Sequence, residues 1–562
     1  MKPSFHVVID IQNPESHRIK VSIYALDDAK LPEILRFPVW TPGSYLVRDY
    51  ARHITNLTPG EKIERSAWRL SGPRKHVSFE VYAFERTVRT PFVDARYAAL
   101  VGAALMPLLH APFTVELLLP KSWTTVSSAL KFRRQAPGKW IANVKNDDHW
   151  IDSPIVAASP GYGEITSFTH QGIRHHIAWV GTECARSNAD LKKDFAKIVD
   201  ATLKFFGGAP FKEYWFLLHF GTKLYGGLEH RDSQLSQFDG SSLADDKEYD
   251  AFLRLIAHEY FHAWNVKSLR PRALGPFDYS MENLTEDLWF AEGITDYFDD
   301  MIPLQAGLLS EENYKKSRLK SVQGMNDGLP GQKRRSVADS SFDAWIRHYK
   351  PDEDTDNTDV SYYTKGALLG WCWDAELQKR TRGRHTLAKL MRSFWEHFGI
   401  DAYEDLQEAK PGYTRRELLA YAEKITGVSH AFVEAWVTAK KPLPWEAAAK
   451  YFRIPFTVKV QDPLLHFSGA QIQWRAGQAI LSKVMSGSAA ESAGLAPGDE
   501  IVAFNDWRAS ENERVLLRWK RVLESKKPVK VLVSRMERLS VLEFRPKSHP
   551  GLGISAELKS ES

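Results

Sequence analysis

Cysteine is scarce in this chain. Only two of the 562 residues are cysteines, Cys184 and Cys372, and they lie far apart in the sequence. This number excludes the disulfide framework of a small secreted protein and the cysteine set of a zinc ribbon. It fits a reducing compartment, and it leaves the chain to build its domains around apolar cores.

Long apolar runs are also missing. An export signal needs an apolar stretch of about 7–15 residues, and Asp10 cuts the first one short. The longest uncharged stretch, residues 97–115, approaches the ~20 residues of a membrane-spanning helix but contains Pro107 and Pro112. We therefore expect a cytoplasmic protein with no membrane span, in which this stretch is buried core or the wall of a binding site.

Neither sign of charge dominates. The 75 Lys and Arg residues exceed the 70 Asp and Glu residues by only five. The charged runs mix both signs, so we expect no nucleic-acid partner. Hydrophobic residues make up 43% of the chain and charged residues 26%, as in soluble globular proteins. At roughly 150 residues per domain, the length predicts three or four folding units.

The chain changes character along its length. Apolar and polar residues alternate from Arg18 to Leu26, which is typical of a strand, and turns rich in Pro and Gly separate similar runs. We predict a multidomain α+β protein, and we divide it by the dominant pattern of each part. The parts are a β-sandwich-like domain (1–165), a catalytic domain (166–380), a helical subdomain (381–450) and a second β domain (456–545).

Helical spacing begins in the second part. Apolar residues recur every three or four positions from Leu191 to Phe206, and Gly207 is a typical C-terminal cap. A second long helix is expected over about residues 250–266. Further helices dominate residues 284–440.

The helix predicted over residues 250–266 carries the sequence His-Glu-Tyr-Phe-His at positions 258–262. Positions four apart share one face of a helix, so His258 and His262 can reach the same metal ion, and Glu259 lies beside them. A catalytic zinc usually takes three protein ligands and leaves one position for water. The motif therefore predicts a metal site that lacks one ligand.

A second predicted helix supplies the missing groups. We predict Glu292 as the third ligand, and Asn283 or Glu286 as the cap of its helix. Asp296 lies one turn beyond Glu292 on the same face, and we expect it to hold the free ring nitrogen of His258. No cysteine lies nearby, so the predicted ligands are histidine and glutamate, as in hydrolytic zinc sites.

These motifs resemble a known family. Residues 258–262, Trp-Asn-Val-Lys at 264–267 and Glu-Gly-Ile-Thr at 292–295 are similar to the glycyl aminopeptidase family of zinc metallopeptidases. Pro-Gly-Ser-Tyr at 42–45 and Val-Arg-Thr at 88–90 resemble that family's N-terminal β domain. The resemblance spans nearly the whole chain, and it implies a thermolysin-like catalytic domain that is distantly related to aminopeptidase N.

The resemblance assigns two further roles. Gly226, Gly227 and Glu229 are similar to the family's exopeptidase motif, which implies that Glu229 holds the free amino group of the substrate. Tyr363 matches the tyrosine that stabilises the oxyanion of the tetrahedral intermediate. Both roles describe an enzyme that cuts beside the amino end of a peptide.

Two positions depart from familiar patterns. The acidic segment at residues 352–356 has the spacing of a calcium loop, but Asn357 replaces the glycine and Tyr363 replaces the final glutamate. We predict a solvated acidic loop there.

Ala291 stands where the thermolysin pattern has the asparagine that orients the second histidine, so His262 has no predicted partner.

The last part of the chain resembles another module. Residues 488–502 are similar to the central stretch of a PDZ domain, with a short helix that Gly494 ends and a Pro-Gly-Asp turn before a strand. The resemblance implies that a peptide C-terminus binds by strand addition. The segment Leu464–Gly469 is the candidate for the loop that holds its carboxylate.

The predicted function is a zinc-dependent aminopeptidase. Zn2+ is held by His258, His262 and Glu292, Glu259 is the general base, and the substrates are peptides with a free N-terminus. The resemblance implies that the residue removed is small, Gly or Ala. Two alternatives stay open. One is a zinc endopeptidase in which Glu229 binds no terminus, and the other is a non-catalytic scaffold that binds peptides through the PDZ-like domain.

Overall fold

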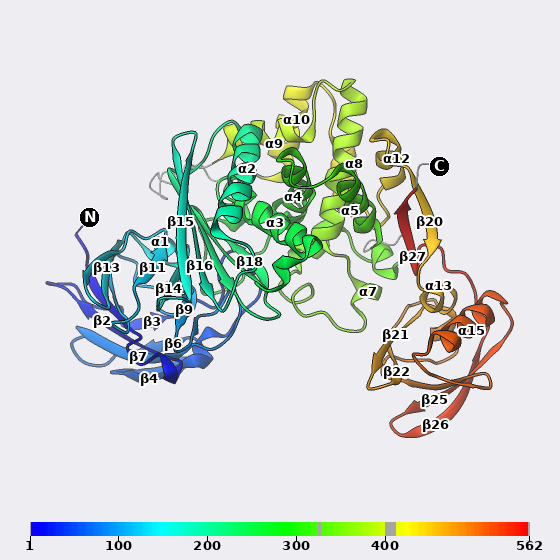
Figure 1. Ribbon diagram of the computed structural model, residues 1–562, viewed down its shortest axis with the longest axis horizontal. Coiled ribbons are helices and arrows are strands. Elements are labelled where there is room, and N and C mark those ends of the chain that lie inside the picture. The colour runs from blue at the N-terminus through cyan, green and yellow to red at the C-terminus, as the bar shows by residue number, and fades with distance from the viewer. Residues whose placement is uncertain (1, 324–327, 400–411, 560–562) are drawn as a thin grey trace. The chain divides into compact units, whose positions relative to one another are not determined.

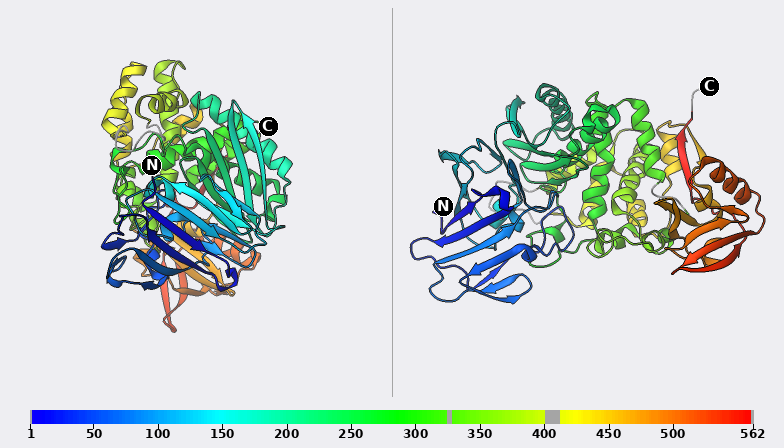
Figure 2. Two further views of the ribbon diagram at one scale, coloured as in Figure 1. Left: turned by 90° about the vertical axis from the view of Figure 1, so that its left-hand side faces the viewer. Right: turned by 60° about the horizontal axis from the view of Figure 1, so that its bottom comes forward.

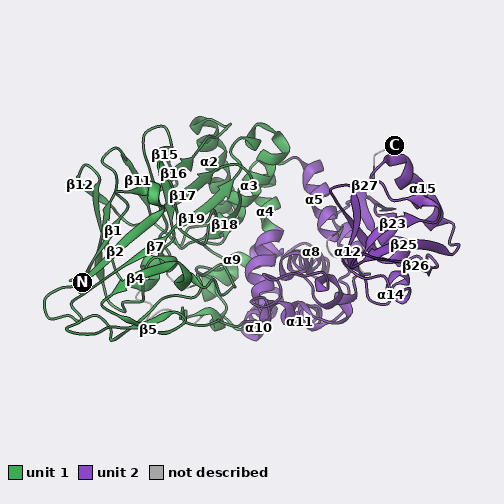
Figure 3. Cartoon of the chain, turned by 90° about the horizontal axis from the view of Figure 1, so that it is seen from below, with its two compact units in different colours: residues 1–284, 298–309, 391–415 green, residues 285–297, 310–390, 416–562 purple. Residues whose placement is uncertain are grey.

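The computed structural model describes residues 2–323, 328–399 and 412–559, and the chain forms two compact units (Figure 3). Unit 1 comprises residues 1–284, 298–309 and 391–415, and unit 2 comprises residues 285–297, 310–390 and 416–562. Both units contain helices and strands. The predicted multidomain α+β fold class, with a β-rich N-terminal part and a helical part further along the chain, is confirmed in this coarse form.

The first part of unit 1 is a β structure (Figures 1 and 2). Strand β1 (Phe5–Asp10) pairs in parallel with β10 (Phe113–Leu118) inside a seven-stranded sheet. Every second residue of β1 is buried, because successive side chains of a strand point to opposite faces. In spatial order the sheet contains β12 (Arg133–Ala136), β13 (Lys139–Val144), β10, β1, β2 (Arg18–Ala25), β7 (His76–Tyr82) and β4 (Ile54–Thr58).

Two smaller sheets and a short helix, α1 (Asp147–Ile151), accompany the large sheet. The four-stranded sheet shares the apolar core of the large one. Residues 97–109 are buried throughout, as expected for this uncharged stretch. In order, the four-stranded sheet contains β11 (Thr125–Ser128), β14 (Ile155–Ala158), β9 (Tyr97–Leu100) and β8 (Phe92–Val93). The three-stranded sheet contains β3 (Ile34–Arg36), β6 (Ala67–Arg69) and β5 (Glu61–Glu64).

A mixed five-stranded sheet follows in unit 1. Helix α2 (Asn188–Phe206) ends at Gly207 in the left-handed conformation, as its sequence predicts. Helix α3 (Asp246–Phe261) begins at Asp245, whose carboxylate accepts hydrogen bonds from two main-chain amides, and it packs against β18 and β19. In order, the strands are β15 (Gly163–His170), β16 (Ile173–Gly181), β17 (Glu213–Phe220), β19 (Ser233–Phe238) and β18 (Tyr225–Glu229).

The segment around Glu292 begins differently from the prediction. It starts as a π-helical turn, η6 (Trp289–Gly293), with no side-chain cap. The side chain of Asn283 donates to the carbonyls of Asp278 and Met281, so the expectation that Asn283 caps this helix is wrong. The helices that follow are α4 (Ile294–Gln305), α5 (Glu311–Gln323), α6 (Val337–Phe342), α7 (Thr355–Thr358), α8 (Tyr362–Thr381), α9 (Leu387–Phe398), α10 (Arg415–Thr426), α11 (Ala431–Thr438) and α12 (Trp445–Tyr451).

The last part of unit 2, residues 456–559, is named the C-terminal module. It has its own apolar core, to which α13 (Pro463–Ser468), α14 (Ala489–Ser492) and α15 (Glu513–Glu524) contribute. Strand β20 (Phe456–Val460) pairs with β27 (Ile554–Leu558). The other sheet contains β21 (Ala470–Arg475), β22 (Gln478–Val484), β23 (Glu500–Phe504), β25 (Val529–Arg535) and β26 (Arg538–Phe544), and β24 (Trp507–Arg508) pairs with β23.

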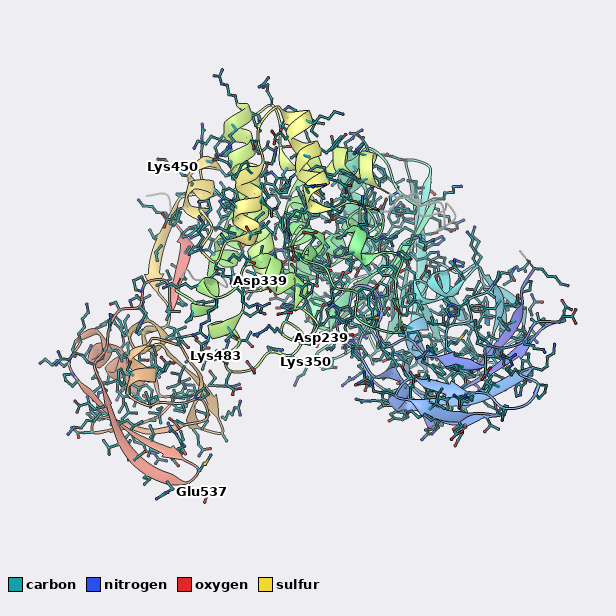
Figure 4. The ribbon with its side chains drawn as sticks, turned by 180° about the vertical axis from the view of Figure 1, so that it is seen from behind. Asp239, Asp339, Lys350, Lys450, Lys483 and Glu537 are labelled. Atoms are coloured by element: carbon teal, nitrogen blue, oxygen red, sulfur yellow. The ribbon has the colours of Figure 1, made fainter. Side chains whose placement is uncertain are left out.

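The acidic segment at residues 352–356 is only partly solvated. Asp352 and Asp354 are exposed, as predicted. Asp356 instead forms an ion pair with Lys483 of the C-terminal module. Lys483 is labelled in Figure 4. Among the described helices, none is long and apolar enough to cross a membrane.

Candidate active site

Helix α3 presents the His-Glu-Tyr-Phe-His sequence near its end. Glu259 is 5% exposed, His262 is 1% exposed, and His258 is also buried. The Nε2 atoms of His258 and His262 lie only 3.0 Å apart, because positions four apart lie on the same face of a helix. Buried imidazoles that converge in this way need a common partner.

A hydrogen bond at one of the opposite ring nitrogens and an ion-pair contact at the other favour one protonation of the two histidines. Nδ1 of His262 lies 2.6 Å from the main-chain oxygen of Asn265, and Nδ1 of His258 lies 3.4 Å from a carboxylate oxygen of Asp299. Both oxygens only accept, so in the neutral rings the proton is on Nδ1. With the proton on Nδ1 of each ring, the Nε2 lone pairs of both rings are available to one cation.

The distances and donor types fit a zinc ion. Two nitrogens bound at 2.0–2.1 Å with tetrahedral geometry lie about 3.3 Å apart, close to the separation found here. Glu292, the predicted third ligand, belongs to unit 2 and is 2% exposed. Two imidazoles and a buried carboxylate are the donor types of a hydrolytic zinc site, and the assignment of all three residues to one ion stays a prediction.

Glu229 ends strand β18, the end strand of the five-stranded sheet. Its carboxylate, Glu259 and His262 offer ligand atoms within 4.8 Å of one another. Glu229 is 3% exposed, and its Oε1 has no hydrogen-bond partner among the described residues. A buried carboxylate with an unpaired oxygen is costly, so this geometry favours a cationic ligand at Glu229.

Glycines surround the two carboxylates. A Cβ atom on Gly227 would lie 2.0 Å from Oε1 of Glu259, and a Cβ on Gly43 would lie 2.2 Å from Oε2 of Glu229. Only glycine therefore leaves room for the carboxylates at these two positions. Gly43 belongs to the Pro-Gly-Ser-Tyr sequence at 42–45, so the β-rich N-terminal part contributes to the surroundings of Glu229.

Unit 2 gathers a second group of side chains around Glu292. Burial raises the pKa of Tyr363 well above its ordinary value, and the negative charge of Glu292 adds to this effect. The ring of His348 stacks on Tyr363, with centroids 5.3 Å apart, and burial lowers the pKa of His348 while Glu292 opposes that shift. Tyr363 is thus a protonated hydroxyl close to the carboxylate of Glu292.

A tight contact positions Tyr363 relative to Glu292. A Cβ on Gly293 would lie 2.4 Å from the Cα of Gly366 and 2.8 Å from the main-chain oxygen of Tyr362. The π-helical turn and the start of α8 therefore touch through their main chains. Because Glu292 precedes one glycine and Tyr363 lies three residues before the other, this contact fixes their spacing.

Another group of charges lies just beyond Glu229. His230 and Lys267 contact Asp152 at 3.1 and 2.7 Å. Burial alone would raise the pKa of Asp152, but Lys267, His230 and Arg231 outweigh it and hold the pKa below its ordinary value. This ion pair joins the turn after β18 to the segment after α3, and so supports the positions of Glu229 and His262.

The sequence did not predict several residues that contact the histidines and the tyrosine of the candidate site. The main-chain oxygen of Asn265 orients His262, although a main-chain group leaves no mark in the sequence beyond the Trp-Asn-Val-Lys motif. Asp299 and His348 lie outside the matched motifs, and only packing brings them to the site. Asp299 lies beside His258 within unit 1, and the role of Asp296 beside His258 stays a prediction.

The comparisons with known proteins bear on these observations. The family model described as M61 glycyl aminopeptidase matches residues 251–369, and the model described as Peptidase M61 N-terminal domain matches residues 6–159. Over these two stretches the chain is similar to the M61 glycyl aminopeptidase family. This confirms the resemblance inferred from the motifs, and it makes the chain a hydrolase of the metallopeptidase class, a metallo-aminopeptidase. No curated protein matches it.

Solved structures similar to this chain include three that are described as aminopeptidases or metallopeptidases. A crystal structure described as an aminopeptidase N family protein from Idiomarina loihiensis is 27% identical, with 98% of both chains covered and a TM-score of 0.86. An M1 zinc metallopeptidase from Deinococcus radiodurans is 11% identical, with 79% and 95% covered and a TM-score of 0.48. Aminopeptidase A from Legionella pneumophila, in complex with aspartic acid, is 13% identical, with 82% and 51% covered and a TM-score of 0.48.

Proposed function

We propose that this chain is a zinc-dependent aminopeptidase that removes a small residue, glycine or alanine, from peptides with a free N-terminus. The observation that carries this proposal is the buried, partly unpartnered carboxylate of Glu229 beside Glu259 and His262. Such a carboxylate pairs with the ammonium group of a substrate and so sets the scissile bond one residue from the chain end. The size preference rests on the family alone.

We assign the metal to His258, His262 and Glu292. Two neutral imidazoles and one carboxylate match zinc in hydrolytic enzymes. Zinc bound there polarises a carbonyl oxygen and makes its bound water acidic. The main-chain oxygen of Asn265 and the carboxylate of Asp299 hold the two rings in the tautomer that leaves Nε2 available, and we assign Asp296 to His258 as a further partner.

Three residues of this chain then transfer the proton, stabilise the oxyanion and bind the amino group of the substrate. Glu259 takes the proton of the attacking water and delivers it to the leaving amine. Tyr363 donates its hydroxyl hydrogen to the carbonyl oxygen that becomes negative, an effect worth about 2.7–4 kcal/mol for comparable donors. The raised pKa of Tyr363 keeps that hydrogen in place at neutral pH. Glu229 holds the amino group throughout.

The decisive test combines metal analysis with an assay of glycine and alanine anilides. We expect one zinc per chain, and we expect Glu259→Gln to retain the metal while kcat falls by a factor of about 100 or more. A Glu259→Gln variant with unchanged activity would show that the proton passes elsewhere and would refute the mechanism.

Glu229→Gln separates an aminopeptidase from an endopeptidase. The variant keeps the shape of the side chain but removes the charge that attracts an ammonium group, so KM for alanine anilide should rise by about tenfold or more. Wild type should refuse N-acetylated peptides. Cleavage of such peptides by wild type at a comparable rate would favour the endopeptidase.

We also propose that the C-terminal module binds peptide C-termini in the manner of a PDZ domain. Strand β21 is an end strand of its sheet, so its outer side can accept an extended peptide. The predicted carboxylate loop, Leu464–Gly469, instead forms helix α13, in which the amide of Gly469 donates to the carbonyl of Leu465. Fluorescence anisotropy of the full chain with free and amidated peptides tests the proposal, which requires preference for the free carboxylate.

A further inference from the structure

Arg89 lies beside strand β18 in unit 1, the strand that ends at Glu229. It follows β7 in the chain and belongs to the Val-Arg-Thr sequence at 88–90 of the β-rich N-terminal part. Its Nη2 is 3.5 Å from the main-chain oxygen of Gly227, and its Nη1 is 3.8 Å from where a Cβ on Gly226 would stand. The guanidinium group therefore lies over the two glycines of β18.

The charge of Arg89 has no carboxylate partner. Among the described residues, no acidic oxygen lies within 4.0 Å of its guanidinium, and its Nε is buried without a hydrogen-bond partner. The 3.5 Å contact with Gly227 is at the outer limit for a hydrogen bond. A half-buried guanidinium in this state has donors free for a planar anion, which it binds well with two parallel bonds.

The order of groups along β18 matches the order of groups in a short peptide. Glu229 offers a negative charge at one end, Gly227 lies against Glu259 in the middle, and Gly226 lies beside Arg89. Two strand positions span about 7 Å and three about 10 Å. An extended dipeptide spans about 7 Å from its amino nitrogen to its carboxylate, the length of two strand positions. A dipeptide that lies along β18 with its amino group at Glu229 therefore brings its carboxylate to Gly227, whose main-chain oxygen Arg89 contacts.

We propose that Arg89 forms a carboxylate subsite that binds the free C-terminus of a dipeptide whose amino group is held by Glu229. The proposal rests on the aminopeptidase function proposed above and names its preferred substrates as dipeptides with a small first residue. Gly227 leaves room for the carboxylate of Glu259, and at Gly226 the nearest atom to an added Cβ is 3.8 Å away, so the space in front of Arg89 is open. A longer peptide or an amide loses the pairing with Arg89.

The test compares Ala-Ala with Ala-Ala amide, which differ only in the terminal charge. We expect wild type to have a kcat/KM at least tenfold higher for the free acid. In Arg89→Gln this ratio should fall to about one, and in Arg89→Lys it should be intermediate. Arg86→Gln is the matched control, because Arg86 is an exposed cation three residues away, and it should keep the wild-type ratio.

Calorimetry makes the outcome independent of turnover. Zinc-loaded Glu259→Gln protein should bind Ala-Ala more tightly than the amide, and addition of Arg89→Gln should remove the difference. A wild-type ratio near one, or an equal loss for acid and amide in Arg89→Gln, would overturn the carboxylate subsite. Failure of the aminopeptidase function would appear instead as zinc-loaded wild type that does not cleave alanine anilide.

Discussion

At the scale of single residues, the site depends on a few positions that leave space for buried charge. Gly43 has a φ of +85° and lies directly against the carboxylate of Glu229. An alanine there meets two obstacles, the left-handed main chain and the carboxylate itself. The first costs stability, and the second displaces the group proposed to hold the amino end of the substrate.

Gly43→Ala should therefore lower activity more than stability. The left-handed conformation costs about 1–2 kcal/mol in any alanine variant, whereas a displaced Glu229 should raise KM for alanine anilide by about tenfold or more. Gly72→Ala is the matched control, because Gly72 has a φ of +76° with no atom within 4 Å of the added Cβ. Similar KM values in the two variants would contradict the role given to Gly43.

A second residue-scale feature is the buried neutral His219 on β17. Its Nδ1 lies 3.0 Å from the amide nitrogen of Gln237, and its Nε2 lies 3.3 Å from the hydroxyl of Tyr97. Burial lowers the pKa of His219 from its ordinary value of 6.5 to about 4. Between these pH values the unfolded chain binds a proton that the folded chain does not. The stability is therefore complete above about pH 6.5 and is lost as the pH falls toward 4.

Acid should therefore destabilise unit 1 through His219. From pH 7.5 to pH 5 the expected loss is about 2 kcal/mol from this group, measured as a shift of the urea unfolding midpoint. In His219→Gln the shift should shrink by that amount, although the variant is less stable at both pH values. His110→Asn, at an exposed histidine, should leave the shift unchanged, and an equal shift in His219→Gln would refute the assignment.

Much of the candidate site follows from the sequence at this scale. The helix period brings His258 and His262 together, and a carboxylate next to the first of them is available as a base. The partners of the two rings do not follow in the same way. A main-chain oxygen holds His262, and Asp299 reaches His258 through packing, neither of which a residue pattern encodes.

At the scale of elements, the π-helical turn η6 and helix α8 form the contact that the chemistry needs. A π turn inserts one residue into a helix and changes the direction of the side chains that follow. The sequence predicts a helix around Glu292 but not this turn, because periodicity does not distinguish the two forms. Gly293 and Gly366 allow the two main chains to touch, so Tyr363 lies near Glu292.

Gly366→Ala tests this contact. Its Cβ would lie 2.7 Å from the main-chain oxygen of Trp289, and a main-chain atom cannot move aside cheaply. We expect kcat to fall by about tenfold or more with little change in bound zinc, because Tyr363 moves relative to Glu292. Gly370→Ala is the control in the same helix, since its closest atom is the flexible end of Ile294 at 2.9 Å. Equal kcat values in the two variants would contradict the argument.

At the scale of the whole molecule, the order of parts along the chain is predictable and their connections are not. Changes of periodicity separate a β-rich beginning, a helical middle and a final β module. The acidic segment was expected to be solvated because five residues with four carboxylates suggest an exposed loop. In unit 2 its last residue and Asn357 instead contact residues more than 120 positions away, and local patterns contain no information about such contacts.

Asn357 should carry most of the attachment of residues 484–486 of the C-terminal module to the acidic segment. Its amide donates to the carbonyl of Val484 at 2.9 Å and accepts from the amide of Ser486 at 2.8 Å. Asn357→Ala removes the buried bond to Val484 and the part-buried bond from Ser486, at a cost of about 1–3 kcal/mol. The pair between Asp356 and Lys483 is about a third exposed on each side, so Lys483→Met should cost less than about 1 kcal/mol.

Hydrogen exchange followed by mass spectrometry measures this attachment directly. In Asn357→Ala, peptides that contain Ser486 should exchange roughly tenfold faster or more, because opening at that amide costs less free energy. Peptides from β25, in the core of the module, should keep their wild-type rates, since the module has its own apolar core. Lys483→Met should leave the Ser486 region close to wild type. Faster exchange in Lys483→Met than in Asn357→Ala would show that the exposed ion pair, and not the buried amide, holds the module to the segment that leads into α8.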